Sequence, residues 1–196
     1  MTASATRVII LKEDEVIERM SCLIEDVEIV VHLNKSEIRV LLHHFSWNKN
    51  ALLDAVAEDE EGTFKAFGLQ KQSSSTKPVP VRNKCALAMC QICYKTILRK
   101  DMDNVCHVCD HPFCMDCWFQ YLKHKISIDK ICIGLECPMT SCKNLVEETF
   151  VFKVFKESPH ILAIYKTLLC ESFVYKSDTL RYIYQEMSFA SPYVKS

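Results

Sequence analysis

Cysteine is concentrated in one part of this chain, and that concentration constrains the fold more than any other feature of the sequence. Of the 12 cysteines, 11 lie between Cys85 and Cys170, and the first eighty residues contain only Cys22. The N-terminal segment has only a short apolar run at residues 8–11, so we expect no secretory signal peptide. In a reducing compartment, dense cysteine indicates metal ligation. We therefore expect an intracellular chain, in the cytoplasm or the nucleus.

Charge and glycine content narrow the class of protein further. The 24 basic and 25 acidic residues give a formal net charge of -1, which is not typical of a general nucleic-acid or membrane binder. We expect neither nucleic acid nor membrane as a partner. The chain has only 3 glycines, where an average usage of ~7% would give ~14. This scarcity favours helices over folds with many tight turns.

The N-terminal residues, 1–68, have the periodicity of a small helical bundle. Three short segments carry apolar residues at helical spacing: Val16, Met20, Ile24 and Val27; Ile38, Leu41, Leu42 and Phe45; Leu52, Leu53 and Val56. Asn34, with Glu37 three residues later, predicts a capping box at the start of the second helix. Trp47 is expected to anchor the packing of this bundle.

Eight residues in the segment 85–147 have the order and spacing of metal ligands. They comprise two Cys-x2-Cys pairs, a Cys-Asp-His triplet and a wider cysteine pair: Cys90, Cys93, Cys109, His111, Cys114, Cys117, Cys137 and Cys142. A structural zinc ion takes four thiolate or imidazole ligands, so eight ligands predict two zinc ions. Chance burial of free thiols would not arrange eight ligands in this order.

This ligand order, seven cysteines with histidine in fourth place, resembles that of a RING domain. The resemblance implies interleaved sites. Cys90, Cys93, Cys114 and Cys117 would hold one zinc ion, and Cys109, His111, Cys137 and Cys142 the other. Cys106 and Cys132 each lie near a predicted ligand, so the spacing alone leaves open which cysteines bind the metal ions. If both Cys106 and Cys109 were ligands, the order would approach that of a PHD-type finger. Only Asp110 separates Cys109 from His111, and this short gap favours the RING.

Two longer segments resemble the Ariadne subfamily of RBR (RING-in-between-RING) ubiquitin ligases. The segment CDHPFCMDCWFQYLKHKI, residues 109–126, is similar to the first RING of that family, as is the wide pair CPMTSC. The segment EIRVLLHHFSWNKNALLDA, residues 37–55, resembles the UBA-like region that precedes this RING. The resemblance implies that the RING recruits a ubiquitin-charged conjugating enzyme. It leaves room for a ubiquitin-like protein or a cullin complex as a ligand of the UBA-like region.

The resemblance also implies a partner-binding surface. Ile92, between the first two ligands, matches the family position that contacts the conjugating enzyme. Pro138, in the second zinc loop, is a further candidate for the same surface. Trp118 is expected to pack in the core, with its face lining that groove.

We expect no counterpart of the family's in-between domain and second RING in this sequence, because no cysteine follows Cys170. We therefore predict that this chain alone binds charged conjugating enzyme without carrying ubiquitin as a thioester. Lys143 follows the eighth ligand, where RING ligases often have arginine, and lysine lacks the planar fork. We therefore expect that this RING alone does not strongly activate the charged conjugating enzyme for ubiquitin transfer.

Together these features predict a mainly α fold with a small zinc-stabilised α+β part. It consists of a UBA-like three-helix bundle (1–68), a linker (69–84), a cross-braced RING-type zinc finger (85–147), and a helical extension with a divergent tail (148–196). Ser158-Pro159 is expected to begin a helix in that extension. The alternative function is a non-catalytic zinc-binding interaction module, either a PHD-like reader or an inhibitory truncated paralogue.

Overall fold

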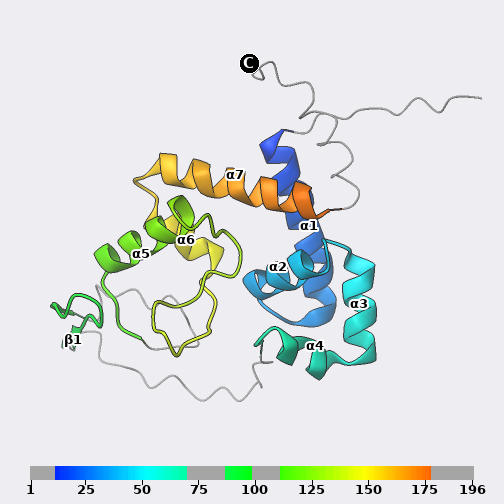
Figure 1. Ribbon diagram of the computed structural model, residues 1–196, viewed down its shortest axis with the longest axis horizontal. Helices are drawn as coiled ribbons and strands as arrows, with labels where there is room; N and C mark the ends of the chain where they lie inside the picture. The colour runs from blue at the N-terminus through cyan, green and yellow to red at the C-terminus, as the bar shows by residue number, and fades with distance from the viewer. Residues whose placement is uncertain (1–11, 70–86, 99–110, 178–196) are drawn as a thin grey trace, which may run out of the picture.

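The structure is a computed structural model that describes residues 12–69, 87–98 and 111–177 (Figure 1). Its N-terminal bundle contains four helices among these residues: α1 (Glu13–Val31), α2 (Lys35–His44), α3 (Lys49–Glu58) and α4 (Glu60–Ala66). The apolar positions of α1 that the sequence singled out are all buried. Helix α2 packs against both α1 and α3, and this packing gives the bundle its core.

The predicted capping box of α2 is confirmed. Asn34 is the N-cap, and its Oδ1 accepts a hydrogen bond from the Glu37 backbone N–H at 3.0 Å. In return, the Asn34 backbone N–H donates to Oε2 of Glu37, also at 3.0 Å. These two bonds satisfy backbone donors that the first turn of a helix leaves free.

Helix α4 was not predicted from the apolar spacing of the sequence. The acidic run at residues 58–61 ends α3 and begins α4, with Asp59 as the N-cap of the new helix. Oδ1 of Asp59 accepts a hydrogen bond from the Gly62 backbone N–H at 2.8 Å. A Cβ on Gly62 would lie 2.0 Å from that carboxylate, so any larger residue here would require the Asp59 side chain to shift.

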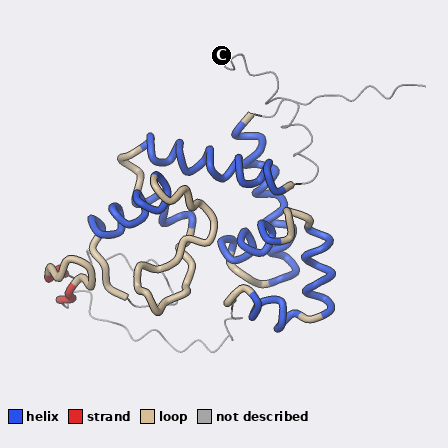
Figure 2. Tube along the Cα trace, viewed as in Figure 1, coloured by secondary structure: helices blue, strands red, loops and turns tan. Residues whose placement is uncertain are grey.

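In the parts of residues 87–154 that the structure describes, the regular elements are two short strands and two helices (Figure 2). Strands β1 (Leu87–Met89) and β2 (Thr96–Leu98) pair antiparallel, with Leu87 opposite Leu98. Helix α5 (Met115–Ser127) follows, and a long loop leads from it to α6 (Glu148–Val154). Within that loop, an isolated antiparallel bridge joins Glu136 to Leu145.

Helix α7 (Pro159–Lys176) runs from the cysteine-rich module back to the bundle (Figure 1). It packs against α5 on one side and against α1 and α2 on the other. Ser158 is its N-cap and proline occupies the first turn, as expected, although the serine side chain makes no capping hydrogen bond. Trp47 of the bundle meets Phe173 of α7 edge-on, with ring centroids 4.6 Å apart. Trp47 therefore anchors the bundle to α7.

The predicted fold class, mainly helical with a cysteine-rich part, is confirmed. One continuous apolar core joins the helices of the bundle, the module and α7. The apolar helical pattern around Cys22 predicts a core thiol, and this prediction is wrong: Cys22 is exposed on α1. Cys22 is two residues from buried Met20, so it lies on the opposite face of the helix. Among the described helices, none combines the length and apolarity needed to cross a bilayer.

Candidate metal centre

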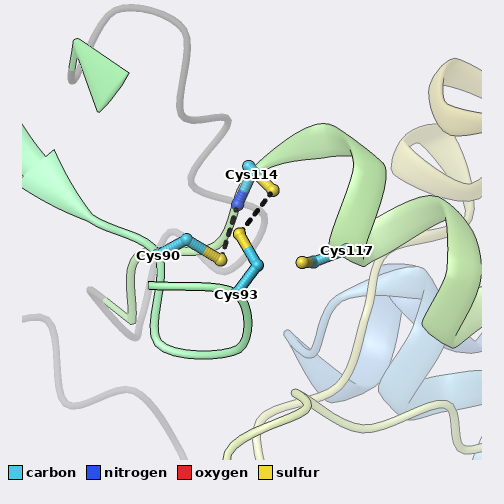
Figure 3. A group of neighbouring side chains, drawn as sticks. All are labelled: Cys90, Cys93, Cys114 and Cys117. Atoms are coloured by element: carbon cyan, nitrogen blue, oxygen red, sulfur yellow. Dashed lines mark hydrogen bonds between the residues drawn. The ribbon is translucent and has the colours of Figure 1, made fainter. Parts of the chain in front are cut away.

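Four cysteines from two separate segments gather in the cysteine-rich module (Figure 3). Cys90 and Cys93 lie in the turn between β1 and β2. Cys114 is the N-cap of α5, and Cys117 lies in the first turn of that helix. All four sulfur atoms lie within 4.8 Å of one another. We call this set the first group.

The spacing within the first group fits a tetrahedral metal ion. A zinc ion with Zn–S bonds of about 2.3 Å separates its sulfur ligands by about 3.8 Å. The Sγ atoms of Cys93 and Cys114 are 3.7 Å apart. The Cys114 backbone N–H also donates to Sγ of Cys90 at 3.4 Å, a hydrogen bond that favours the thiolate. The residues of the first group therefore fit a closed, four-ligand structural site.

The thiol pKa values in the first group diverge strongly. Burial raises the pKa of Cys90, but backbone N–H donors from Cys93, Cys114 and Ile92 outweigh burial and lower it to about 6. The pKa of Cys117 is raised far above its usual range by burial and by the neighbouring sulfur atoms. Without a cation, negative charge on one thiolate disfavours ionisation of the next. A divalent metal removes this conflict, because it allows every sulfur to be a thiolate.

The second group consists of His111, Cys137 and Cys142, whose ligand atoms also lie within 4.8 Å of one another. Nδ1 of His111 and Sγ of Cys137 are 3.6 Å apart. The two cysteines belong to the loop between α5 and α6. The Cys137 backbone N–H donates to the carbonyl oxygen of Asn144 at 2.9 Å, which holds the two sides of this loop together.

A hydrogen bond that the sequence did not suggest ties this loop to α5. The Tyr121 hydroxyl donates to the backbone carbonyl of Glu136 at 2.9 Å. Glu136 directly precedes Cys137, so α5 positions a member of the second group as well as Cys114 and Cys117 of the first.

The two groups interleave along the chain. His111 lies between Cys93 and Cys114 in sequence, yet it joins Cys137 and Cys142. The structure thus brings together seven of the eight residues singled out as ligands, in the pairing that the RING resemblance implies. The eighth, Cys109, lies outside the described residues, as do Cys106 and Cys85.

Cys132 belongs to neither group within the described part of the chain. It is buried, and burial raises its thiol pKa to about 11. The apolar helical pattern around Cys170 predicts a core thiol, and this is confirmed: Cys170 is buried, and burial raises its pKa to about 11. Both thiols are therefore almost wholly protonated near neutral pH, which makes them poor nucleophiles.

The three residues proposed as a partner surface differ in exposure. Ile92 is 43% exposed in the turn between Cys90 and Cys93, whereas Trp118 is only 2% exposed. The indole of Trp118 packs edge-on against Phe113 and Phe150, in agreement with the expected core role. Pro138 is half-buried beside Cys137. Of the three, only Ile92 offers a large apolar side chain to solvent.

The fold and the two groups define a class of protein: a helical bundle joined to a cross-braced cysteine/histidine module. Comparison with known proteins agrees. The UBA-like domain of the E3 ubiquitin-protein ligase ARIH1 matches residues 18–58. The chain is 33% identical over 171 residues to the probable E3 ubiquitin-protein ligase ARI9 of Arabidopsis thaliana, covering 80% of this chain and 30% of that protein.

Animal relatives show the same relationship. The E3 ubiquitin-protein ligase ariadne-1 of Drosophila melanogaster is 26% identical over 88% of this chain and 34% of its own length. ARIH1 of Bos taurus is 29% identical over 84% of this chain and 30% of its own length. The chain is therefore similar to Ariadne-type E3 ubiquitin-protein ligases over most of its own length, and it spans about a third of the length of these relatives. The resemblance inferred from the sequence is confirmed.

Proposed function

We propose that this chain recruits a ubiquitin-charged conjugating enzyme, as part of protein ubiquitination. In this proposal the first and second groups each hold one zinc ion, and Cys109 completes the second site. Bound zinc supplies structural cross-links, because a site closed by four protein ligands has no open position for substrate. The relationship to Ariadne-type E3 ubiquitin ligases supports the role in ubiquitination.

The observation that carries the proposal is the exposure of Ile92. The turn that presents it is held by three backbone hydrogen bonds: Cys90 N–H to Lys95 O at 3.0 Å, Tyr94 N–H to Cys90 O at 2.9 Å, and Gln91 N–H to Pro112 O at 3.1 Å. A large aliphatic side chain held at 43% exposure on a rigid turn gains stability when a partner covers it. Ile92 therefore has the properties of an interface anchor.

Ile92→Ala is expected to weaken binding of charged conjugating enzyme about tenfold or more, because truncating a central apolar anchor removes its buried contact area. Titration of the zinc-loaded chain with charged enzyme, followed by NMR or calorimetry, measures the change in Kd. Ile128→Ala is the matched control, since Ile128 is 68% exposed at the opposite end of α5 from Cys114. Equal Kd values for Ile92→Ala and the unmodified chain would contradict the proposal.

The residue at position 143 is lysine, which favours recruitment of the charged conjugating enzyme without strong activation of its thioester. Nζ of Lys143 donates to Oε2 of Glu136 at 3.0 Å, across the bridge that closes the second metal loop. This ion pair is exposed and contributes little, but lysine lacks the bidentate geometry of arginine. We propose that the chain positions the charged enzyme and adds little to the reactivity of its thioester.

A further inference from the structure

A partly buried ion pair joins the N-terminal bundle to the cysteine-rich module. Arg39 of α2 donates from Nη2 to Oε2 of Glu148, the first residue of α6, at 2.8 Å. The two residues are 109 positions apart in sequence. The Arg39 side chain is 7% exposed and that of Glu148 is 28% exposed. An exposed ion pair contributes little, but a guanidinium this deeply buried depends on its counter-charge.

Elements of both parts of the chain surround this pair. Two side chains interact electrostatically with Arg39: Cys132, in the loop between α5 and α6, and Tyr165 of α7. In the same loop, a Cβ on Gly134 would lie 3.8 Å from the side chain of Val40, the neighbour of Arg39 on α2. The pair therefore lies where α2, α6, α7 and the loop of the second group meet.

Helix α7 makes contacts on both sides of this junction. On the bundle side, Thr167 donates a hydrogen bond to Glu13 of α1 at 2.9 Å. On the module side, Tyr165 meets Phe152 of α6 edge-on, with ring centroids 6.2 Å apart. The first of these contacts is an exposed hydrogen bond and the second is an apolar ring contact, whereas a charge-assisted ion pair has a defined geometry.

We propose that the Arg39–Glu148 pair is a positioning contact that fixes the orientation of the bundle relative to the cysteine-rich module. The pair acts at the base of α6, directly after the loop that contains Cys137 and Cys142. It therefore sets where the Ile92 turn lies with respect to α1. A partner that contacts both the Ile92 turn and α1 would bind two surfaces that are already in the correct relative orientation. The complex would then lose less conformational entropy on binding.

Substitution of Glu148 and substitution of Arg39 are expected to have effects of different size. Glu148→Gln leaves the buried Arg39 charge without a counter-ion, and within the described residues no acceptor meets Nε of Arg39 either. Arg39→Met leaves a carboxylate that is partly exposed and can be hydrated. Glu148→Gln is therefore expected to have the larger effect, and the double variant Arg39→Met/Glu148→Gln should recover part of it.

Hydrogen exchange and small-angle X-ray scattering of the full zinc-loaded chain test the proposal. In Glu148→Gln, exchange in α2, α6 and residues 132–135 should become about tenfold faster or more, while α3 and α4 keep their protection. The scattering of the folded protein should show a broader distribution of distances between bundle and module, which a loss of stability alone would not produce. Glu148→Asp keeps the charge, so its exchange rates and its distance distribution should lie between those of Glu148→Gln and those of the unmodified chain.

The matched control is Lys35→Met. Lys35 lies one helical turn before Arg39 on α2 and pairs with Glu25 and Glu28, but it is 55% exposed, so its loss should change neither measurement. Unchanged scattering in Glu148→Gln would overturn the proposal. So would faster exchange spread evenly over α3, α4 and α6, because that result would indicate general destabilisation.

Discussion

Replacing Cys114 with serine is expected to remove one zinc ion and to unfold the cysteine-rich module. Cys114 contributes Sγ to the first group, donates its backbone N–H to Cys90, and is the N-cap of α5. Binding of a structural zinc ion contributes about 10–16 kcal/mol, which is comparable to the whole stability of a typical domain, about 5–15 kcal/mol. The described residues of the module form only two three-residue strands and two helices, and so little regular structure is not expected to replace that contribution by apolar burial.

The change can be followed by the fluorescence of Trp118, which is 2% exposed and should move to a wet environment when α5 is released. Cys22→Ser is the control, because Cys22 is exposed on α1 and outside both groups. A Cys114→Ser protein that kept its metal content and its melting temperature would show that the first group is not a metal site.

Trp118→Ala is expected to lower the free energy of unfolding by about 3–5 kcal/mol, the usual cost of truncating a large buried aromatic side chain. The indole contacts Phe113 before α5, Tyr121 on α5 and Phe150 on α6, so its loss leaves a cavity where the three segments meet. Urea denaturation of the zinc-loaded chain measures the loss.

Trp118→Phe should cost much less. It keeps an aromatic ring, and within the described residues the indole N–H has no acceptor to lose. If Trp118→Ala kept full stability but failed to bind charged conjugating enzyme, the side chain would belong to the partner surface and the core assignment would be wrong.

Local patterns were sufficient to predict the features that depend on neighbouring residues. The capping box at Asn34 and Glu37 needs only residues three apart, and the buried face of α1 needs only helical periodicity. The grouping of His111 with Cys137 and Cys142 was implied by the RING ligand order, because interleaved sites are a property of that fold. These features follow from short spacings or from a family pattern.

Long-range packing could not be predicted in the same way. Arg39 lies on α2 among apolar positions, and nothing near it in sequence indicates a counter-charge at Glu148. Helical spacing predicts one apolar face for α7 through Leu162, Tyr165, Leu169 and Phe173, but Leu162 is only half-buried, and Ile161, Cys170 and Val174 are buried as well. This wide apolar surface follows from contacts with both the bundle and α5, which sequence periodicity alone does not show.

Counting bound zinc by native mass spectrometry tests the central claim of two interleaved metal sites most directly. Two zinc ions are expected in the full chain and also in Cys106→Ser and Cys132→Ser, because neither residue has a place in the ligand order. Cys137→Ser should retain one. A single zinc ion in the unmodified chain, or the loss of zinc from Cys132→Ser, would contradict the two-site arrangement and the presentation of Ile92 that depends on it.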